Sequence, residues 1–142
     1  MKAIILRDSY FLVNLFFLVI ILAVFGYSLF FGTSGREHPL PSGSAIFTGE
    51  PSVSTGLSRS FSALMHFDME RARFYNRHGT RIFLFFLIQL AMRTGALVFC
   101  VHAEAGEKQY MVRMDILLSA LLFVISFWPF LTAFVKMITG RS

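Results

Sequence analysis

Apolar residues in this chain gather in three long runs separated by polar stretches. The runs cover residues 10–31, 81–101 and 114–138. A helix rises about 1.5 Å per residue, so each run is long enough to cross the roughly 30 Å hydrocarbon core of a bilayer. The pattern predicts an all-α integral membrane protein with three transmembrane helices, forming a single membrane domain over residues 1–142.

The stretch between the first two runs predicts shorter elements. Residues 32–50 are rich in Gly, Ser and Pro and indicate an irregular connection. Residues 54–76 predict one or two short interfacial helices, the first capped by Ser54 or Thr55 and the second by Asp68. The spacing predicts an apolar face opposite a polar face in the first helix. The apolar face comprises Leu57, Phe61, Leu64 and Met65, and the polar face Arg59, Ser62 and His66.

The first run has a second interpretation, a cleavable signal peptide, because Lys2 and Arg7 precede it. The run exceeds the roughly 7–15 apolar residues of a signal peptide, and no small-residue cleavage site follows it. We therefore expect a retained helix.

Composition agrees with membrane embedding, since 56% of the residues are hydrophobic and 18 are Phe. The net charge of +5 raises the question of nucleic acid. The basic residues, however, cluster at the ends of apolar runs, which is typical of membrane anchoring, so we expect no nucleic-acid partner. Cys100 is the single cysteine, which excludes an intramolecular disulfide and a cysteine metal site within one chain.

Two polar residues, Gln89 and Arg93, interrupt the second run one helical turn apart on one face. A central arginine costs about 2.5–3.5 kcal/mol on insertion scales, so it should face protein or extend toward water. Asp8 and Asp115 begin the first and third runs on the same side of the membrane. Extension toward the His102 end and pairing with one of these aspartates both remain open.

The third run contains Trp128 and Pro129. Pro129 removes a backbone hydrogen bond, so we expect a kink there, with Ser126 able to satisfy a freed carbonyl. Trp128 lies at membrane depth, where packing against a partner or a cofactor contact would both use its aromatic surface.

Three spans place the N-terminus on one side and residues 32–80 with the C-terminus on the other. The first side carries Lys2, Arg7, Lys108 and Arg113. The second carries Arg36, Arg59, Arg71, Arg73, Arg77, Arg81, Lys136 and Arg141, so the positive-inside rule predicts that it is cytoplasmic. Arg71, Arg73, Arg77 and Arg81 are either candidate sites for phospholipid head groups or a topology signal alone.

Residues 48–76 resemble an uncharacterised bacterial membrane family whose signature is Thr-Gly-x-x-Cys-Pro-x-Cys-Gly-x-Thr-Arg, followed by Gly-Asp, Ala and Asn-Pro. The matching positions are Thr48, Gly49, Gly56, Arg59, Asp68, Ala72 and Asn76. The resemblance covers residues 42–76 and implies a helical protein of the bacterial cytoplasmic membrane. It assigns no activity.

The departures from this signature concern its chemistry. Ser52 and Thr55 occupy the two cysteine positions, Ser42 aligns with a third, Phe67 replaces the Gly and Arg77 replaces the Pro. Hydroxyl groups are poor ligands for soft metals and lack thiol redox chemistry. We therefore expect no metal site, and a remnant scaffold in which Arg59 and Asp68 form an ion pair.

Three functions stay open. The first hypothesis is a non-catalytic accessory subunit of a larger membrane protein complex, because the sequence contains no catalytic motif. The second is a self-associating carrier or pore with Asn14, Gln89 and Arg93 facing its lumen. The third, a cofactor- or pigment-contacting subunit, would use His66, His78 or His102, although no particular cofactor is predicted.

Overall fold

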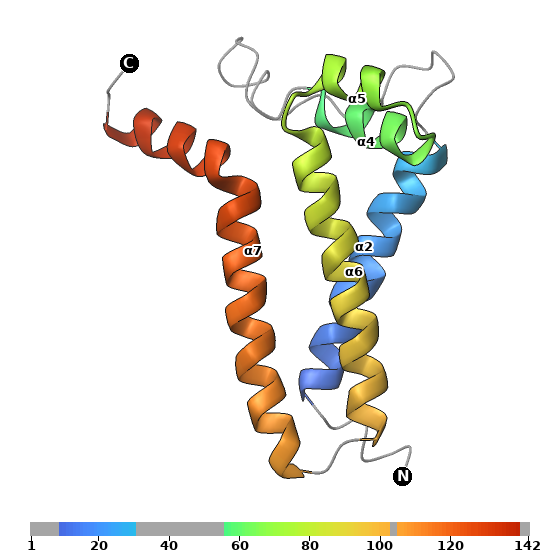
Figure 1. The fold of residues 1–142 in the computed structure, drawn as a ribbon, viewed down its shortest axis with the longest axis vertical. Helices are drawn as coiled ribbons and strands as arrows, with labels where there is room; N and C mark the ends of the chain where they lie inside the picture. The colour runs from blue at the N-terminus through green and yellow to red at the C-terminus, as the bar shows by residue number, and fades with distance from the viewer. Residues whose placement is uncertain (1–8, 31–55, 103–104, 140–142) are drawn as a thin grey trace.

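The computed structural model describes residues 9–30, 56–102 and 105–139 (Figure 1). Within these ranges all regular structure is α-helical and comprises three long helices with two short helices between the first and second. The helices are α2 (Ser9–Phe30), α4 (Leu57–Met65), α5 (Met69–Tyr75), α6 (Gly79–His102) and α7 (Ala105–Thr139).

The long helices confirm the predicted all-α fold with three spans. The stretches long and apolar enough to cross a membrane are Ser9–Phe30, Gly79–His102 and Glu107–Lys136. The described residues are therefore those expected of a multi-pass membrane protein. Helices α2 and α6 cross at a shallow angle, while α7 leans away from both at its C-terminal end (Figure 1).

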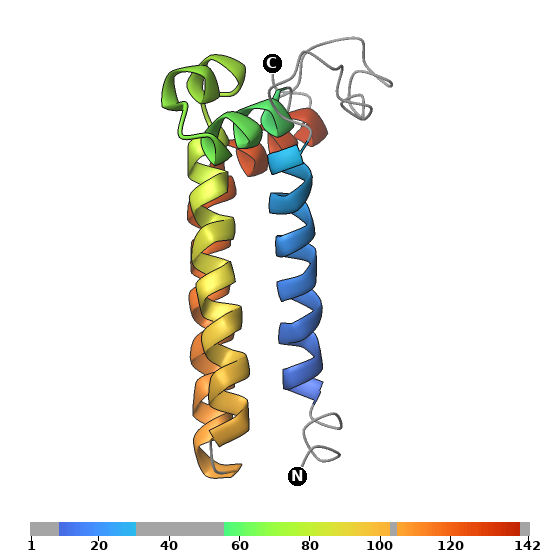
Figure 2. The ribbon, with the colours of Figure 1, turned by 90° about the vertical axis from the view of Figure 1, so that its right-hand side faces the viewer.

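The third span differs from its prediction in where the helix begins and agrees with it in shape. Helix α7 begins at Ala105 instead of residue 114, so the polar residues before the apolar run also become helical. Toward its C-terminal end α7 bends away from the bundle axis (Figures 1 and 2). Pro129 lies inside the helix in this part, and its carbonyl accepts a 3.0 Å hydrogen bond from Thr132 Oγ1. The expected kink is present.

The two short helices form a cap over one end of α2 and α6. Helix α4 runs across the two spans, and α5 lies on α4 on the side away from them (Figures 1 and 2). Phe61 of α4 packs edge-on against Phe83 and Phe86 of α6, with ring centroids 5.5 and 5.9 Å apart. Phe25 of α2 meets Phe83 at 5.2 Å. Aromatic packing therefore holds α4 against α6, and α6 against α2.

Three local predictions for this cap are wrong. Helix α4 begins after its N-cap residue Gly56, whose φ of 77° is left-handed, and among the described residues no side chain caps it. Ser54 and Thr55 lie outside the described residues. Ser62 belongs to the buried face, not the polar one, because its hydroxyl donates a 2.7 Å hydrogen bond to the Ser28 carbonyl. Asp68 forms an ion pair with Arg71 at 3.4 Å, not with Arg59.

Candidate functional site: a polar cluster inside the membrane

Five polar side chains from all three spans meet at one depth. We call them the polar cluster: Tyr10 and Asn14 of α2, Arg93 of α6, and Asp115 and Ser119 of α7. Asn14 is fully buried and Arg93 is only 6% exposed. The hydrocarbon region offers no water to these groups, so they must satisfy one another.

Arg93 is the centre of the polar cluster. Its Nη1 donates to Asp115 Oδ2 at 2.9 Å, while Nη2 donates to Asp115 Oδ1, which makes the pair bidentate. Nη1 also reaches Asn14 Oδ1 at 2.6 Å, and Nη2 reaches Ser119 Oγ at 2.8 Å. Of the two arrangements open from the sequence, the structure shows the ion pair, with Asp115 as the partner.

The α2 members complete the contacts of the aspartate. The Tyr10 hydroxyl donates to Asp115 Oδ2 at 2.9 Å, and Asn14 Nδ2 donates to the Tyr10 carbonyl at 2.8 Å. The orientation of Asn14 is fixed by these bonds, since its amide oxygen faces the guanidinium. A charge-assisted network of this kind holds α2, α6 and α7 in one register.

Of the other residues expected to contact partners inside the membrane, Gln89 and Trp128 lie apart from the polar cluster. Gln89 is buried one turn before Arg93, and its Nε2 has no hydrogen-bond partner among the described residues. Trp128 is 57% exposed on α7, and Asp8 lies outside the described residues. The structure therefore joins Arg93 to Asp115 and leaves Gln89 and Trp128 outside the network.

The residues of the family-like motif support the cap. At Gly56 an added Cβ would lie 2.3 Å from the Tyr75 carbonyl oxygen, so the two short helices touch through this glycine. Asp68 caps α5 by accepting from the Arg71 N–H at 3.0 Å, as predicted. Asn76 ends α5 and accepts a 2.8 Å bond from the His78 N–H. Arg59 is exposed, and Gly49 lies outside the described residues.

Two buried contacts in the cap were not predicted from sequence. Ser60 donates a 2.8 Å hydrogen bond to the Ala72 carbonyl, which ties α4 to α5. Gly79 opens α6 directly against Ser60, where an added Cβ would lie 2.0 Å from Ser60 Oγ. The sequence does carry a signal for such burial: serines stand at every second position from 58 to 62. On a helix these serines point in different directions, so at least one of them must face the protein.

Basic residues gather around this cap. Arg71 and Arg73 of α5, Arg77 of the turn that follows and Arg81 at the start of α6 are all exposed. They lie beyond or at the end of the span, where lipid head groups and aqueous partners are both within reach.

The described histidines lie at helix ends. His66 ends α4, His102 ends α6, and His78 immediately precedes α6. Burial lowers the pKa of His78, and the positive charges of Arg77 and Arg81 lower it further. Within residues 9–30, 56–102 and 105–139 there is no group of three His, Cys, Asp or Glu side chains that could hold a metal ion.

Comparison of the chain with known protein families, curated proteins and solved structures found no match. The family resemblance accordingly rests on the motif residues alone. What the structure adds is a physical role for several of those residues in the cap.

Proposed function

We propose that this chain is a non-catalytic accessory subunit of a larger membrane protein complex in the bacterial cytoplasmic membrane. It contributes packed helices, contacts phospholipid head groups through the arginines near the span end, and presents the cap to a partner subunit on the cytoplasmic side.

The observation that carries this proposal is the exposure of aromatic rings on the cap. Phe67 is 88% exposed and Phe74 of α5 is 85% exposed. Helix α5 lies on the side of α4 that faces away from the spans (Figure 1), and Phe67 and Phe74 belong to the segment that runs from the end of α4 through α5. Exposed aromatic rings outside the hydrocarbon region are typical of protein interfaces.

The backbone of Phe67 strengthens this interpretation. Its φ of 60° is left-handed, a conformation that favours glycine and is uncommon for a bulky side chain. The Phe67 N–H bonds to the Leu64 carbonyl at 3.0 Å, which closes α4. The family signature has glycine at this position. A phenylalanine here adds backbone strain without burying its ring, so we infer that the ring is retained for a contact outside the chain.

The polar cluster favours a subunit over the alternative, a carrier or pore. Of the residues expected to line a lumen, Asn14, Gln89 and Arg93, the arginine bonds both Asn14 and Asp115 inside one chain, and Gln89 is buried. Groups committed to internal hydrogen bonds are poorly suited to line an aqueous path.

Native mass spectrometry after gentle extraction of the tagged chain from its own membrane tests the proposal. We expect a defined larger subunit to be recovered in stoichiometric amount with the wild type, and to be lost with Phe67→Gly combined with Phe74→Ser. Phe67→Gly alone relieves the left-handed strain, so it should raise thermal stability while it weakens partner retention. A variant that loses its partner because it misfolds would show lower thermal stability as well as weaker partner retention.

Tyr110→Ser is the matched control, because Tyr110 is an exposed aromatic residue on α7, near the other end of the bundle. It should leave partner retention unchanged. Recovery of the wild-type chain alone, or as a closed homo-oligomer, contradicts the proposal and favours the carrier.

Cysteine labelling tests the proposed orientation. Ser34→Cys and Ser142→Cys should react with a membrane-impermeant maleimide only after the cytoplasmic side is opened. Labelling of intact cells from the periplasmic side would reverse the proposed topology.

A further inference from the structure

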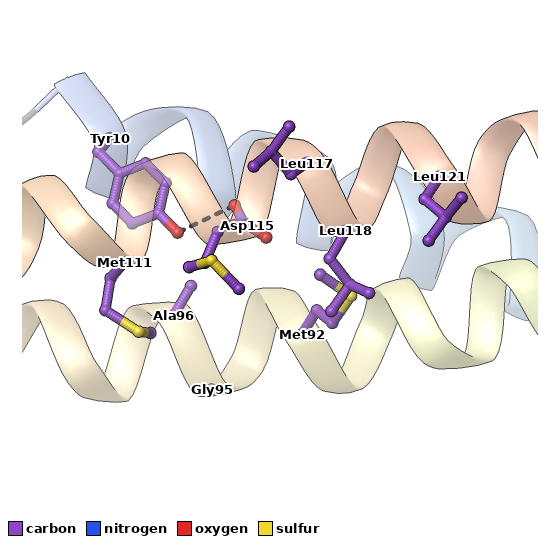
Figure 3. Close-up of a pocket in the computed structure, with 10 residues that line it drawn as sticks. Tyr10, Met92, Gly95, Ala96, Met111, Asp115, Leu117, Leu118 and Leu121 are labelled. Atoms are coloured by element: carbon purple, nitrogen blue, oxygen red, sulfur yellow. Dashed lines mark hydrogen bonds between the residues drawn. The ribbon is translucent and has the colours of Figure 1, made fainter.

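A groove of about 450 Å³ runs between α6 and α7, beside the polar cluster (Figure 3). Gly95 and Ala96 line its α6 wall, and Met111 and Leu121 mark its ends on α7. Tyr10 of α2 lines the same end as Met111 (Figure 3). The volume lies within the range of about 300–1,000 Å³ that is typical of small-molecule sites.

The groove is a fixed feature of the helix pair. The bidentate contact between Arg93 and Asp115 sets the separation of α6 and α7 at this depth. Gly95 and Ala96 follow Arg93 and are too small to fill the space; a Cβ added at Gly95 would meet no atom within 4 Å. An open apolar groove of this kind gains dispersion contacts when another molecule fills it.

The chemistry of the lining selects an apolar occupant. Tyr10 and Asp115 are the polar side chains among the lining residues, and they are bonded to each other. Both Asp115 oxygens also accept from Arg93. The remaining wall consists of Leu, Met, Ala and Gly, and methionine side chains adapt to irregular apolar partners.

The dimensions match one leaflet of a bilayer. From Met111 to Leu121 the helix rises about 15 Å at 1.5 Å per residue, which is half of the roughly 30 Å hydrocarbon core. The Met111 end lies near the start of the candidate span Glu107–Lys136, so a lipid head group would stand at this end. A hydrocarbon chain could therefore enter at that end and lie along the helices to the middle of the membrane.

The charge at this end indicates the head group. Lys108 lies one helical turn before Met111 on the same face of α7, and Arg113 follows two residues after it. Lys108 lies beyond the Met111 end of the groove, where a phosphate would stand, whereas Arg113 lies past Met111 and on the opposite face of the helix. We propose that the groove binds one acyl chain of an anionic phospholipid, with the phosphate beside Lys108. This proposal does not depend on the subunit role.

The test uses the full chain purified in mild detergent with added dioleoyl phosphatidylglycerol, followed by native mass spectrometry. We expect one phosphatidylglycerol to remain bound per wild-type chain. Gly95→Leu fills the groove and should lower this occupancy at least tenfold. Gly26→Leu is the matched control, because Gly26 also lies in a span with no atom within 4 Å of an added Cβ, and it should retain the lipid.

Two further variants keep the test decisive. Leu121→Trp fills the groove from the α7 wall and should also expel the lipid, which covers the case in which Gly95→Leu fails to fold. Lys108→Gln should lower the preference for phosphatidylglycerol over phosphatidylcholine while an acyl chain still binds.

Three results would overturn the proposal. The first is a wild-type chain that retains no phospholipid, and the second is equal retention by Gly95→Leu and Gly26→Leu. The third is a lipid-free dimer of the wild type that Gly95→Leu dissociates, which would assign the groove to a second copy of the chain.

Discussion

Arg93 and Asp115 face each other across α6 and α7, with both terminal guanidinium nitrogens on the two carboxylate oxygens. Each partner is also held by α2, since Asn14 accepts from Arg93 and Tyr10 donates to Asp115. The contact thus joins three helices that also share apolar contacts, such as Phe25 with Phe83 and Phe85 with Phe127. Because apolar side chains gain little from leaving lipid for one another, a polar contact of this kind can determine how the helices associate.

Breaking the pair from one side should be more damaging than removing it. We expect Arg93→Leu and Asp115→Leu each to destabilise the chain by about 3–5 kcal/mol, because each leaves one buried charge without its partner. The double variant should lose less than the sum of the two. Thermal unfolding in detergent, followed by the monodisperse fraction on size exclusion, measures all four proteins of the cycle.

Arg81→Leu serves as the control for this cycle, because Arg81 is an exposed arginine at the start of the same helix. It should change stability by less than about 0.5 kcal/mol, as surface substitutions usually do. Additive losses in the double variant would show that Arg93 and Asp115 act independently, contrary to the structure.

The sequence predicted the spans because a long apolar run in a lipid bilayer generally forms a transmembrane helix. It also indicated two aspartates on the same side of the membrane as candidate partners for Arg93, with extension of the side chain toward water as the alternative. It could not place Asn14, Tyr10 and Ser119 beside them, because hydropathy records depth and not the rotation of a helix about its axis. The predicted Arg59–Asp68 ion pair is wrong because Arg71 lies one helical turn from Asp68 and pairs with it instead.

The contact between the short helices gives a second prediction. Gly56→Ala should destabilise the cap by more than about 1 kcal/mol, since its backbone is left-handed and the new methyl group would collide with the Tyr75 carbonyl. Hydrogen exchange of the α4 and α5 amides should rise before global unfolding. Gly26→Ala, in open space on α2, should be neutral or slightly stabilising. Equal exchange in the two variants would contradict the close approach at Gly56.

Ser62 gives a third prediction, on the link between α4 and α2. Ser62→Ala removes the hydrogen bond to the Ser28 carbonyl and should cost about 1–3 kcal/mol, because that carbonyl stays buried without this donor. Ser58→Ala, at an exposed position of the same helix, should have little effect. Thermal unfolding of the two variants is compared. Because both are Ser→Ala changes on the same helix, they alter helix propensity equally, and the difference between them reports the lost hydrogen bond.

The cap also shows where sequence analysis of short helices is weak. The amphipathic pattern predicts Ser62 on the polar face of the helix, yet Ser62 is fully buried. A hydroxyl group can be buried when a free carbonyl meets it, and here α2 supplies one from Ser28. That partner lies 34 positions earlier in the chain, so the local pattern could not reveal it.

His78 links the cap to α7 and predicts a dependence on pH. Its ring lies 6.2 Å from that of Phe130, which follows Pro129 at the bend of α7. Burial, followed by repulsion from Arg77 and Arg81, lowers the pKa of His78 below its ordinary value of 6.5. The folded state therefore binds fewer protons at this site than the unfolded state does in the interval between the two pKa values.

The free energy of unfolding should consequently rise with pH across that interval. The contribution of His78 is complete above about pH 6.5 and is lost as the pH falls through the lowered pKa of the folded state. His78→Gln removes this titration and keeps the hydrogen bond that the backbone N–H of residue 78 donates to Asn76 Oδ1. We expect the thermal stability of the wild type, measured from pH 7.5 to 4.5, to fall relative to the variant below pH 6.5. Parallel curves would show that His78 has the same proton affinity in the folded and unfolded chains.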